Sequence, residues 1–397
     1  MLMALIQSVE VSGKAGKPIK VDIISPIPFL AHAFGQAGSF HDFMKERLCK
    51  RPCTLDRPWH FILYADEVTP GNPLGEARRK LWVMYWSLRE MGGLGLQKEA
   101  CWFPLLCVKT SLVSQIDDGL SQLTASILKH TFLSSPCRAD SGFFMKAPNK
   151  TPHFFAFKFA HCLQDGAAHK LMYGCKGDAG TRYCFICLNL VSERASLVQD
   201  GETMLVCQLH KTSALRMASD DDVFNTIDRL IAKKDELNAA DYKLWQQACG
   251  FAYSKCGLLF DPLLRPMLKP VSSFTHDWMH CILSNGVFAT TMHSWLDAVE
   301  KTMDIYTTLS NYLPKWHLPQ HQACKLDLLF TEKKRKANRE GCTFKSSASE
   351  ALSLLPILCY FIQAVLIPAS VCVCQREHSD LAFVGSAHTL TVAGVSP

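Results

Sequence analysis

Runs of aromatic and β-branched residues, separated by turn-forming residues, recur between residues 59 and 161. Such runs suit strands because their side chains pack on a pleated sheet, whereas Pro, Gly and Asn interrupt them. Apolar residues three or four positions apart, beginning with Leu112, Ile116 and Leu120, instead indicate a helix. The pattern therefore predicts strands over 59–67, 81–88, 100–110 and 153–161, with a helix over 112–132 before the last strand.

The order of these elements is typical of one fold class. Three strands in a meander, a crossover helix and a fourth strand form the opening of an RNase H-like domain, although other α+β folds share that order. We expect the first part of such a core over residues 59–175. The predicted class is α+β (α/β), with an RNase H-like mixed sheet and a large, mostly helical insertion over 176–345.

The segments around the predicted sheet have residue patterns that do not predict strands. Residues 1–58 predict an irregular lead-in with one helix near 40–49. Within the insertion, helical spacing predicts amphipathic helices. These cover residues 220–234, 239–251 and 277–313.

A strongly apolar segment follows the insertion. Residues 346–370 predict a helix that returns to the core, and residues 371–397 predict an irregular tail. The stretch 352–374 is long enough to cross a bilayer, but Pro356 and Pro368 interrupt it. A buried helix explains the stretch equally well, so we favour a protein without a membrane anchor.

Composition narrows the class of protein further. The 397 residues suffice for two or three domains, and 48% apolar with 20% charged residues is a globular balance. The net charge of +6 permits nucleic-acid binding without requiring it. The N-terminal residues do not resemble a signal peptide, so we expect the eighteen cysteines to be metal ligands or buried thiols in a reducing compartment.

Two carboxylates end predicted strands. Asp66 lies at the end of the first strand, and Asp165 follows the fourth. Glu67 is adjacent to Asp66 but faces the other side of the strand, so we choose Asp66, which shares its face with Ile62 and Tyr64. Carboxylates that converge from different strands can hold Mg²⁺ or Mn²⁺. The alternative is that each Asp only caps a turn or helix.

A second cluster has the spacing of a zinc site. Cys184 and Cys187 are followed, beyond a polar loop, by Cys207 and His210, with nineteen residues between Cys187 and Cys207. Two close pairs of this kind fold back to offer four tetrahedral ligands, which makes the predicted Zn²⁺ structural. We place this zinc-binding element within residues 176–212. The alternative is coincidence, since a chain with many cysteines contains close pairs by chance.

Five short motifs, taken in order, carry a family resemblance. They are Tyr-Ala-Asp-Glu-Val-Thr-Pro-Gly-Asn at 64–72, Gln-Asp-Gly-Ala-Ala at 164–168, Lys-Gly-x-x-Gly-x-x-x-Cys-x-x-Cys at 176–187, Asp-Trp-Met-His at 277–280 and Ala-Ser-Glu-Ala-Leu at 348–352. The set resembles transposon-derived proteins of dinoflagellate genomes, which look like distant relatives of CACTA-type DDE transposases. The resemblance covers roughly residues 58–367.

The resemblance implies further roles. Glu350 would be the third acid beside Asp66 and Asp165, holding the catalytic Mg²⁺ or Mn²⁺. Asp277 and His280 match an Asp-x-x-His motif of the wider class. Each has a purely structural alternative: Glu350 as a first-turn residue facing the helix dipole, Asp277 as a helix N-cap, and His280 as a packed, hydrogen-bonded side chain. The structural alternative is favoured for the Asp277–His280 pair.

The expected function is metal-dependent cleavage and strand transfer of DNA by a nuclear DDE-type transposase, in an active form or as an inactive or truncated descendant. A basic run formed by Lys333, Lys334, Arg335 and Lys336 offers phosphate contacts or a nuclear localisation signal. DNA is the expected partner, and the sequence is also compatible with a homo-oligomer. The alternatives are a non-catalytic, zinc-containing module that binds nucleic acid or protein, and a cysteine hydrolase, for which no nucleophile motif is present.

Overall fold

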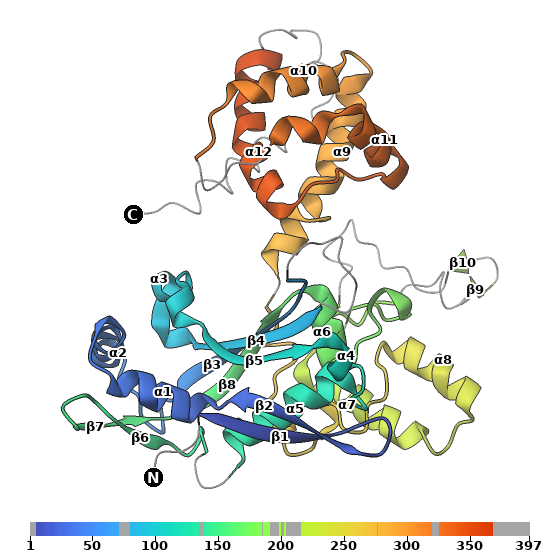
Figure 1. Ribbon diagram of the computed structural model, residues 1–397. Coiled ribbons are helices and arrows are strands. Elements are labelled where there is room, and N and C mark those ends of the chain that lie inside the picture. Colours follow the sequence, from blue (N-terminus) through green and yellow to red (C-terminus); the bar gives the residue numbers. More distant parts are fainter. Residues whose placement is uncertain are drawn as a thin grey trace. The chain divides into compact units, whose positions relative to one another are not determined.

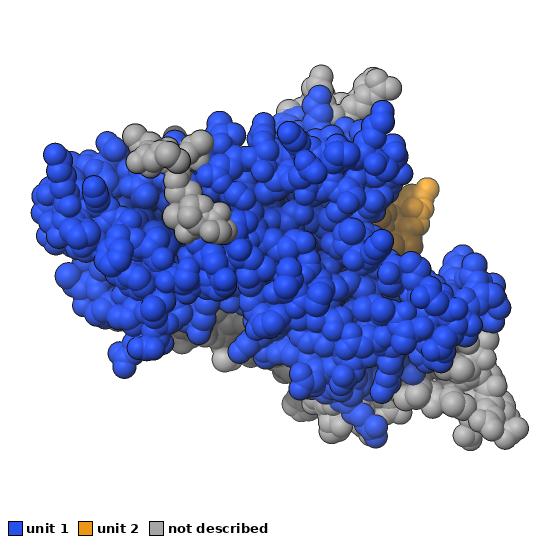
Figure 2. Space-filling view, turned by 90° about the horizontal axis from the view of Figure 1, so that it is seen from below, with its two compact units in different colours: residues 1–275 blue, residues 276–397 orange. Residues whose placement is uncertain are grey.

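The structure is a computed structural model (Figure 1). It describes residues 5–70, 80–134, 138–184, 186–190, 198–199, 202–203, 216–275, 277–319 and 325–367. The chain divides into two compact units, unit 1 over residues 1–275 and unit 2 over residues 276–397, which are coloured separately in Figure 2. The fold is mixed α+β, with a mixed four-stranded sheet in unit 1 and a largely helical C-terminal half.

A four-stranded sheet is the centre of unit 1. Its strands are β3 (Trp59–Val68), β4 (Leu81–Leu88), β5 (Phe103–Lys109) and β8 (Phe157–Gln164). The order across the sheet is β5-β4-β3-β8, with β3 antiparallel to β4 and parallel to β8. The helices α4 (Thr110–Val113) and α5 (Gly119–Phe132) connect β5 toward β8. The predicted meander and mixed sheet are confirmed, whereas the single crossover helix expected over 112–132 is two helices, with a break over residues 114–118.

One face of this sheet carries the apolar core. Alternate residues of β3, among them Phe61 and Leu63, are fully buried and belong to the main hydrophobic cluster. The Phe61 ring stacks on Trp86 of β4 at 5.2 Å and meets Phe132 of α5 edge-on at 5.6 Å. The helix α5 therefore covers this core face, and the other face of the sheet carries the more polar alternate residues.

The N-terminal segment is ordered, so the prediction of an irregular lead-in is wrong. It contains β1 (Ile6–Ser12), β2 (Pro18–Ile24), α1 (Pro26–Gly35) and α2 (Ser39–Lys50). In the β1–β2 hairpin, Val9 pairs with Val21 and both side chains are buried while their neighbours are exposed. This two-residue period is the signature of a half-buried strand. Only the helix expected near 40–49 is confirmed, as α2.

The predicted fourth strand is two strands. The hairpin β6 (Phe143–Lys146) and β7 (Pro152–Phe155) forms a separate two-stranded sheet, and only β8 joins the central sheet. The chain leaves one sheet for the other at Ala156, which is fully buried and whose amide donates to the Cys53 sulfur. A run of aromatic residues conceals such a change because both strands bury aromatic side chains.

Helices and short turns complete unit 1. They are α3 (Gly92–Leu96), α6 (Gly166–Tyr173), α7 (Asp220–Lys233) and α8 (Ala239–Cys249), with the two-residue strands β9 (Val198–Gln199) and β10 (Glu202–Thr203). The helix α6 ends at Gly174, which has a φ of 68° and donates its amide to Lys170. Glycine reaches this left-handed conformation without steric cost. The amphipathic helices expected at 220–234 and 239–251 are confirmed as α7 and α8.

Unit 2 is helical and has a core of its own. Its helices are a turn over Met279–Leu283, α9 (Val287–Glu300), α10 (Ile305–Tyr312), α11 (Glu332–Gly341) and α12 (Ala348–Phe361), which continues as a π-helical turn over Ile362–Leu366. The single long helix expected from 277 to 313 is wrong, because the chain breaks at Gly286 and again before Asp304, which caps α10.

The apolar helix of unit 2 includes most of the segment whose length and composition suggested a membrane anchor. Residues Ala348–Leu366 are long and apolar enough to cross a bilayer, and a third of that window is buried inside the protein. The buried side chains of α12, which include Leu354, Leu358 and Phe361, belong to the helical core of unit 2. The expected return of α12 to the core of the sheet stays a prediction. The irregular tail expected over 371–397 lies outside the described residues and also stays a prediction.

Candidate active site at the carboxyl end of two parallel strands

Asp66 lies near the end of β3 on the more polar face of the sheet. Its half-buried side chain accepts a hydrogen bond from the Tyr64 hydroxyl, with Tyr64 Oη and Asp66 Oδ2 3.1 Å apart. Residues two apart on a strand share one face, so this bond fixes the carboxylate on the side away from the apolar core. The prediction that Asp66 shares one face of the strand with Tyr64 is therefore confirmed.

Asp165 follows directly after β8 and begins α6. It is the N-cap of this helix, and its Oδ1 accepts a hydrogen bond from the amide of Ala168 at 2.6 Å. The cap satisfies one of the amides that the first turn of a helix leaves without an intrahelical partner. The structural alternative for Asp165 is thus present in the structure. A cap through one oxygen is compatible with metal binding, because each carboxylate oxygen has two lone pairs.

The register of the sheet brings these two acids to one place. Ala65 and Gln164 are partners in the parallel β3–β8 ladder, and each is followed by one of the two acids: Asp66 is still on β3, and Asp165 lies just past the end of β8. Neighbouring strands lie about 4.8 Å apart, so both carboxylates leave the same end of the sheet from adjacent strands. That separation is small enough for two side chains to share an ion whose ligand bonds are about 2.1 Å.

Glu67, the neighbour of Asp66, has a different environment. It accepts hydrogen bonds from Lys80 Nζ at 2.7 Å and from Thr110 Oγ1 at 2.8 Å. Burial alone would raise the pKa of Glu67, but these two hydrogen bonds and the Lys80 charge outweigh it and lower the pKa. Glu67 therefore ties the ends of β3, β4 and β5 together on the face opposite to Asp66.

Aromatic side chains gather around Tyr64, the residue that donates a hydrogen bond to Asp66. The Tyr64 ring lies 6.3 Å from the ring of Tyr85 on β4 and 6.1 Å from the ring of Trp102. Trp102 is held in place by its Nε1, which donates to the carbonyl of Leu96 at 2.8 Å. Sequence reasoning missed this group, although the two-residue period of 81–88 places Tyr85 opposite Tyr64 once the strands are paired.

A histidine pair occupies the other end of the same face. His60 Nδ1 lies 2.8 Å from Oε1 of Glu90, whose fully buried carboxylate also accepts the His60 amide and the Arg51 guanidinium. On β8, burial lowers the pKa of His161, and the nearby charges of Arg89 and His60 add to the effect. The bonds to Glu90 tie the start of β3 to the segment that follows β4, and burial favours the neutral form of the His161 ring.

Glu350 lies in unit 2 and has a clear structural role. It forms a capping box with Ser347: the Ser347 amide donates to Glu350 Oε2 at 2.7 Å, and the Glu350 amide donates to Ser347 Oγ at 3.2 Å. This reciprocal arrangement satisfies two amides at the start of α12. The assignment of Glu350 as a third metal ligand stays a prediction.

The Asp277–His280 motif forms a local pair. Asp277 Oδ1 accepts the amides of Met279 and His280 at 3.0 and 3.3 Å, and Asp277 Oδ2 lies 2.6 Å from His280 Nδ1. Asp277 therefore caps the turn that opens unit 2, which agrees with the favoured structural alternative. His280 is hydrogen-bonded but exposed, so its expected packing is wrong.

The four expected zinc ligands fall only partly on described residues. Cys184 and Cys187 lie in one turn, closed by a bond from the Cys187 amide to the Cys184 carbonyl at 3.3 Å. Cys207 and His210 lie outside the described residues. Within the described part of the chain, no group of three or more His, Cys, Asp and Glu side chains is placed to hold a metal ion. The zinc site stays a prediction.

The basic run forms a helix with its own acidic partners. Lys333, Lys334, Arg335 and Lys336 begin α11. Arg335 is paired with Glu300 and lies over the Tyr306 ring at 5.4 Å, so this cation contributes to the core of unit 2. The more exposed lysines of the run remain the candidates for phosphate contacts.

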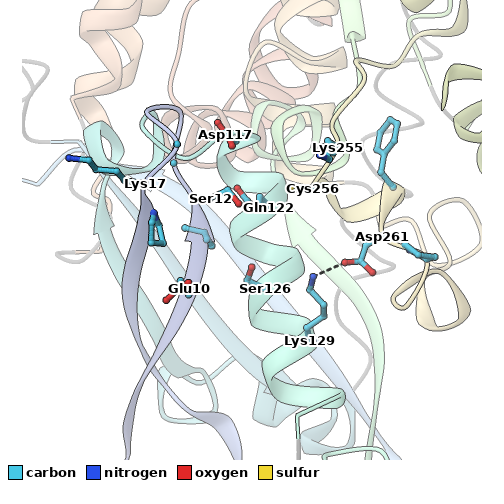
Figure 3. Close-up of a pocket in the computed structure, with 16 residues that line it drawn as sticks. Glu10, Ser12, Lys17, Asp117, Gln122, Ser126, Lys129, Lys255, Cys256 and Asp261 are labelled. Carbon is cyan, nitrogen blue, oxygen red and sulfur yellow. Dashed lines mark hydrogen bonds and ion pairs between the residues drawn. The ribbon is translucent and has the colours of Figure 1, made fainter. Parts of the chain in front are cut away.

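A polar pocket of about 750 Å³ lies elsewhere in unit 1 (Figure 3). It is formed by the turn of the β1–β2 hairpin, by α5 and by residues 255–262. An ion pair between Lys129 and Asp261, 2.7 Å long, crosses one side of it. Acidic and basic side chains are balanced in its lining, so its charge favours neither an anionic nor a cationic ligand.

No protein-family model matches this chain, and no curated protein is similar to it.

Proposed function

We propose that unit 1 carries the first two acids of a DDE-type polynucleotidyl transferase with an RNase H-like core. The observation that carries this proposal is the position of Asp66 and Asp165 at the same end of two adjacent parallel strands. In this account Asp66, Asp165 and Glu350 hold Mg²⁺ or Mn²⁺, and the DNA phosphodiester is the substrate. The protein would act in the nucleus on the ends of a mobile element.

The residues present fit such an ion in their chemistry. Mg²⁺ and Mn²⁺ prefer carboxylate oxygens, and the two aspartates offer these from separate strands of a rigid sheet. When bound, the ions would activate the attacking oxygen and stabilise the leaving oxygen of an in-line displacement at phosphorus. Tyr64 orients the Asp66 carboxylate through its hydroxyl, and the start of α6 holds that of Asp165.

The test is Mn²⁺ binding by the purified full chain, followed by electron paramagnetic resonance. Asp66→Asn and Asp165→Asn should each weaken binding, because a neutral amide replaces a charged ligand of the same shape. Asp304→Asn is a matched control, since Asp304 is also an N-cap, at the start of α10. Binding that is equally strong in wild type and both variants would refute the proposal.

A second function is favoured by a specific observation. Asp165 and Glu350 both complete helix caps, as they would in a descendant that kept the fold and lost catalysis. Such a protein would be a non-catalytic, zinc-containing module that binds nucleic acid or another protein. DNA binding without cleavage of the element's own terminal sequence, in a chain that binds zinc but not Mn²⁺, would favour it.

The cysteine hydrolase receives little support from the described thiols. Burial raises the pKa of Cys162 to about 12, and it also raises the pKa of Cys53, Cys101 and Cys249. A nucleophilic cysteine needs a lowered pKa, because the thiolate is the reactive form.

A further inference from the structure

The face of the sheet that carries Asp66 is rich in rings, and it is partly exposed at Tyr85. Strand alternation and register place Tyr64 and Tyr85 side by side on this face, and ring contact adds Trp102. About a third of the Tyr85 side chain is exposed. The elements of unit 1 that build the main core, α5 above all, pack against the opposite face. The three rings therefore form a surface beside the candidate active site, which we call the aromatic platform.

Two lysines lie on the same face of the sheet as the platform, one on each edge strand. Lys109 is on the edge strand β5, where it pairs with Leu81 of β4. Lys158 is on the other edge strand, β8, where it pairs with His60 of β3. Both lysines are exposed. The described ion pairs do not engage either of them. Flat rings between separated positive charges match a ligand that alternates flat bases with phosphates.

Stacking chemistry points to unpaired bases as the occupant. Every base has a π-face that can stack on Tyr or Trp, whereas bases inside a duplex already stack on one another. Trp102 is fixed by its bond to Leu96, so little ring mobility is lost on binding. Asp66 lies two residues beyond Tyr64 on β3, a step of about 6.6 Å. A base on the platform would therefore set its own phosphate close to the carboxylates.

We infer that the aromatic platform binds unpaired DNA bases next to the phosphate that is cut. The inference rests on the proposed function for its choice of DNA, and it adds a substrate class: ends whose bases are single-stranded at the cleavage position. Tyr85 is the residue that determines this preference, because its ring is the exposed member of the three and takes no part in the hydrogen bond to Asp66.

The experiment measures binding of fluorescent oligodeoxythymidine to the full chain by anisotropy, in EDTA so that no metal contributes. Tyr85→Thr removes the ring and keeps a residue that favours strands. Base–aromatic stacking is worth about 1–3 kcal/mol per base, so affinity should fall about 5- to 150-fold. Tyr85→Phe should bind within about twofold of wild type, because the ring is retained. Tyr360→Ala, which removes an exposed ring of unit 2, should change nothing.

Three results would overturn the inference. They are wild-type affinity in Tyr85→Thr with an unchanged melting temperature, an equal loss in Tyr360→Ala, and tighter binding to a duplex or to oligouridine than to oligodeoxythymidine. If Tyr85→Thr fails to fold, Tyr85→Leu takes its place: a loss of affinity in that variant supports the inference, and wild-type affinity overturns it. Because this assay contains no metal, its failure leaves Mn²⁺ binding at Asp66 and Asp165 intact, and the two failures are distinguishable.

Discussion

Replacing Asp165 by Asn and by Ala separates its two roles. Asn is as good an N-cap as Asp, because its side-chain oxygen accepts the same amide bond. Asp165→Asn should therefore keep the bond to the Ala168 amide, which is 2.6 Å long in the native protein. Asp165→Ala removes both the cap and the carboxylate. Only the second variant should lose stability, whereas both should lose metal affinity.

The magnitudes follow from the structure. Loss of an N-cap costs about 0.5–2 kcal/mol, and for a unit of this size about 1 kcal/mol lowers the melting temperature by roughly 2–4 °C. Removal of a residue that only supports a metal ligand weakens metal binding by about 10- to 100-fold. Loss of a charged ligand itself should weaken Mn²⁺ binding by at least that much.

The assay combines thermal unfolding with Mn²⁺ titration of wild type, Asp165→Asn and Asp165→Ala. We expect melting temperatures of wild type and Asp165→Asn to agree, with Asp165→Ala lower. We expect Mn²⁺ affinity to be high only in wild type. If Asp165→Asn retains wild-type Mn²⁺ affinity, Asp165 is a cap and nothing more, and the catalytic assignment fails.

The remaining predictions concern other groups. Glu350→Gln should preserve the capping box with Ser347 and the stability of unit 2, and it should reduce Mn²⁺-dependent DNA cleavage; full cleavage activity would remove Glu350 from the site. Cys184→Ser with Cys187→Ser should abolish a zinc content of about one per chain, measured by elemental analysis; unchanged zinc content would exclude this pair as ligands. The lowered pKa of Glu67 means that its contribution to stability is present above the unfolded-state pKa and is lost as the pH falls through the folded-state pKa. Denaturant unfolding at a series of acidic pH values should thus show a smaller loss of stability in Glu67→Gln than in wild type, and parallel curves would contradict this.

Local patterns predicted the sheet well because its side chains obey a short-range rule. The aromatic and β-branched runs of β3 and β4 pack on a pleated surface, and the end of β3 placed Asp66 correctly beside Tyr64. The N-terminal hairpin also obeys this rule, because exposed Glu10 and Lys20 alternate with buried Val9, Val11 and Val21, so this local signal was present in the sequence and was missed.

The remaining features depend on contacts between distant residues. The division of β7 from β8 at Ala156 is decided by pairing with different strands. The platform of Tyr64, Tyr85 and Trp102 exists only once three segments are brought together. The role of Glu350 as a third acid stays a prediction, because a short motif does not determine tertiary packing.

The central claim, that Asp66 and Asp165 share a metal ion, is tested most directly by a crystal structure of the full chain grown with Mn²⁺, with anomalous scattering used to place the ion. The account predicts an anomalous peak at the carboxyl end of β3 and β8, with oxygens of both carboxylates about 2.0–2.2 Å from it. An Asp66 carboxylate still bonded to Tyr64 and an Asp165 carboxylate still capping α6, with no anomalous peak between them at saturating Mn²⁺, would contradict it.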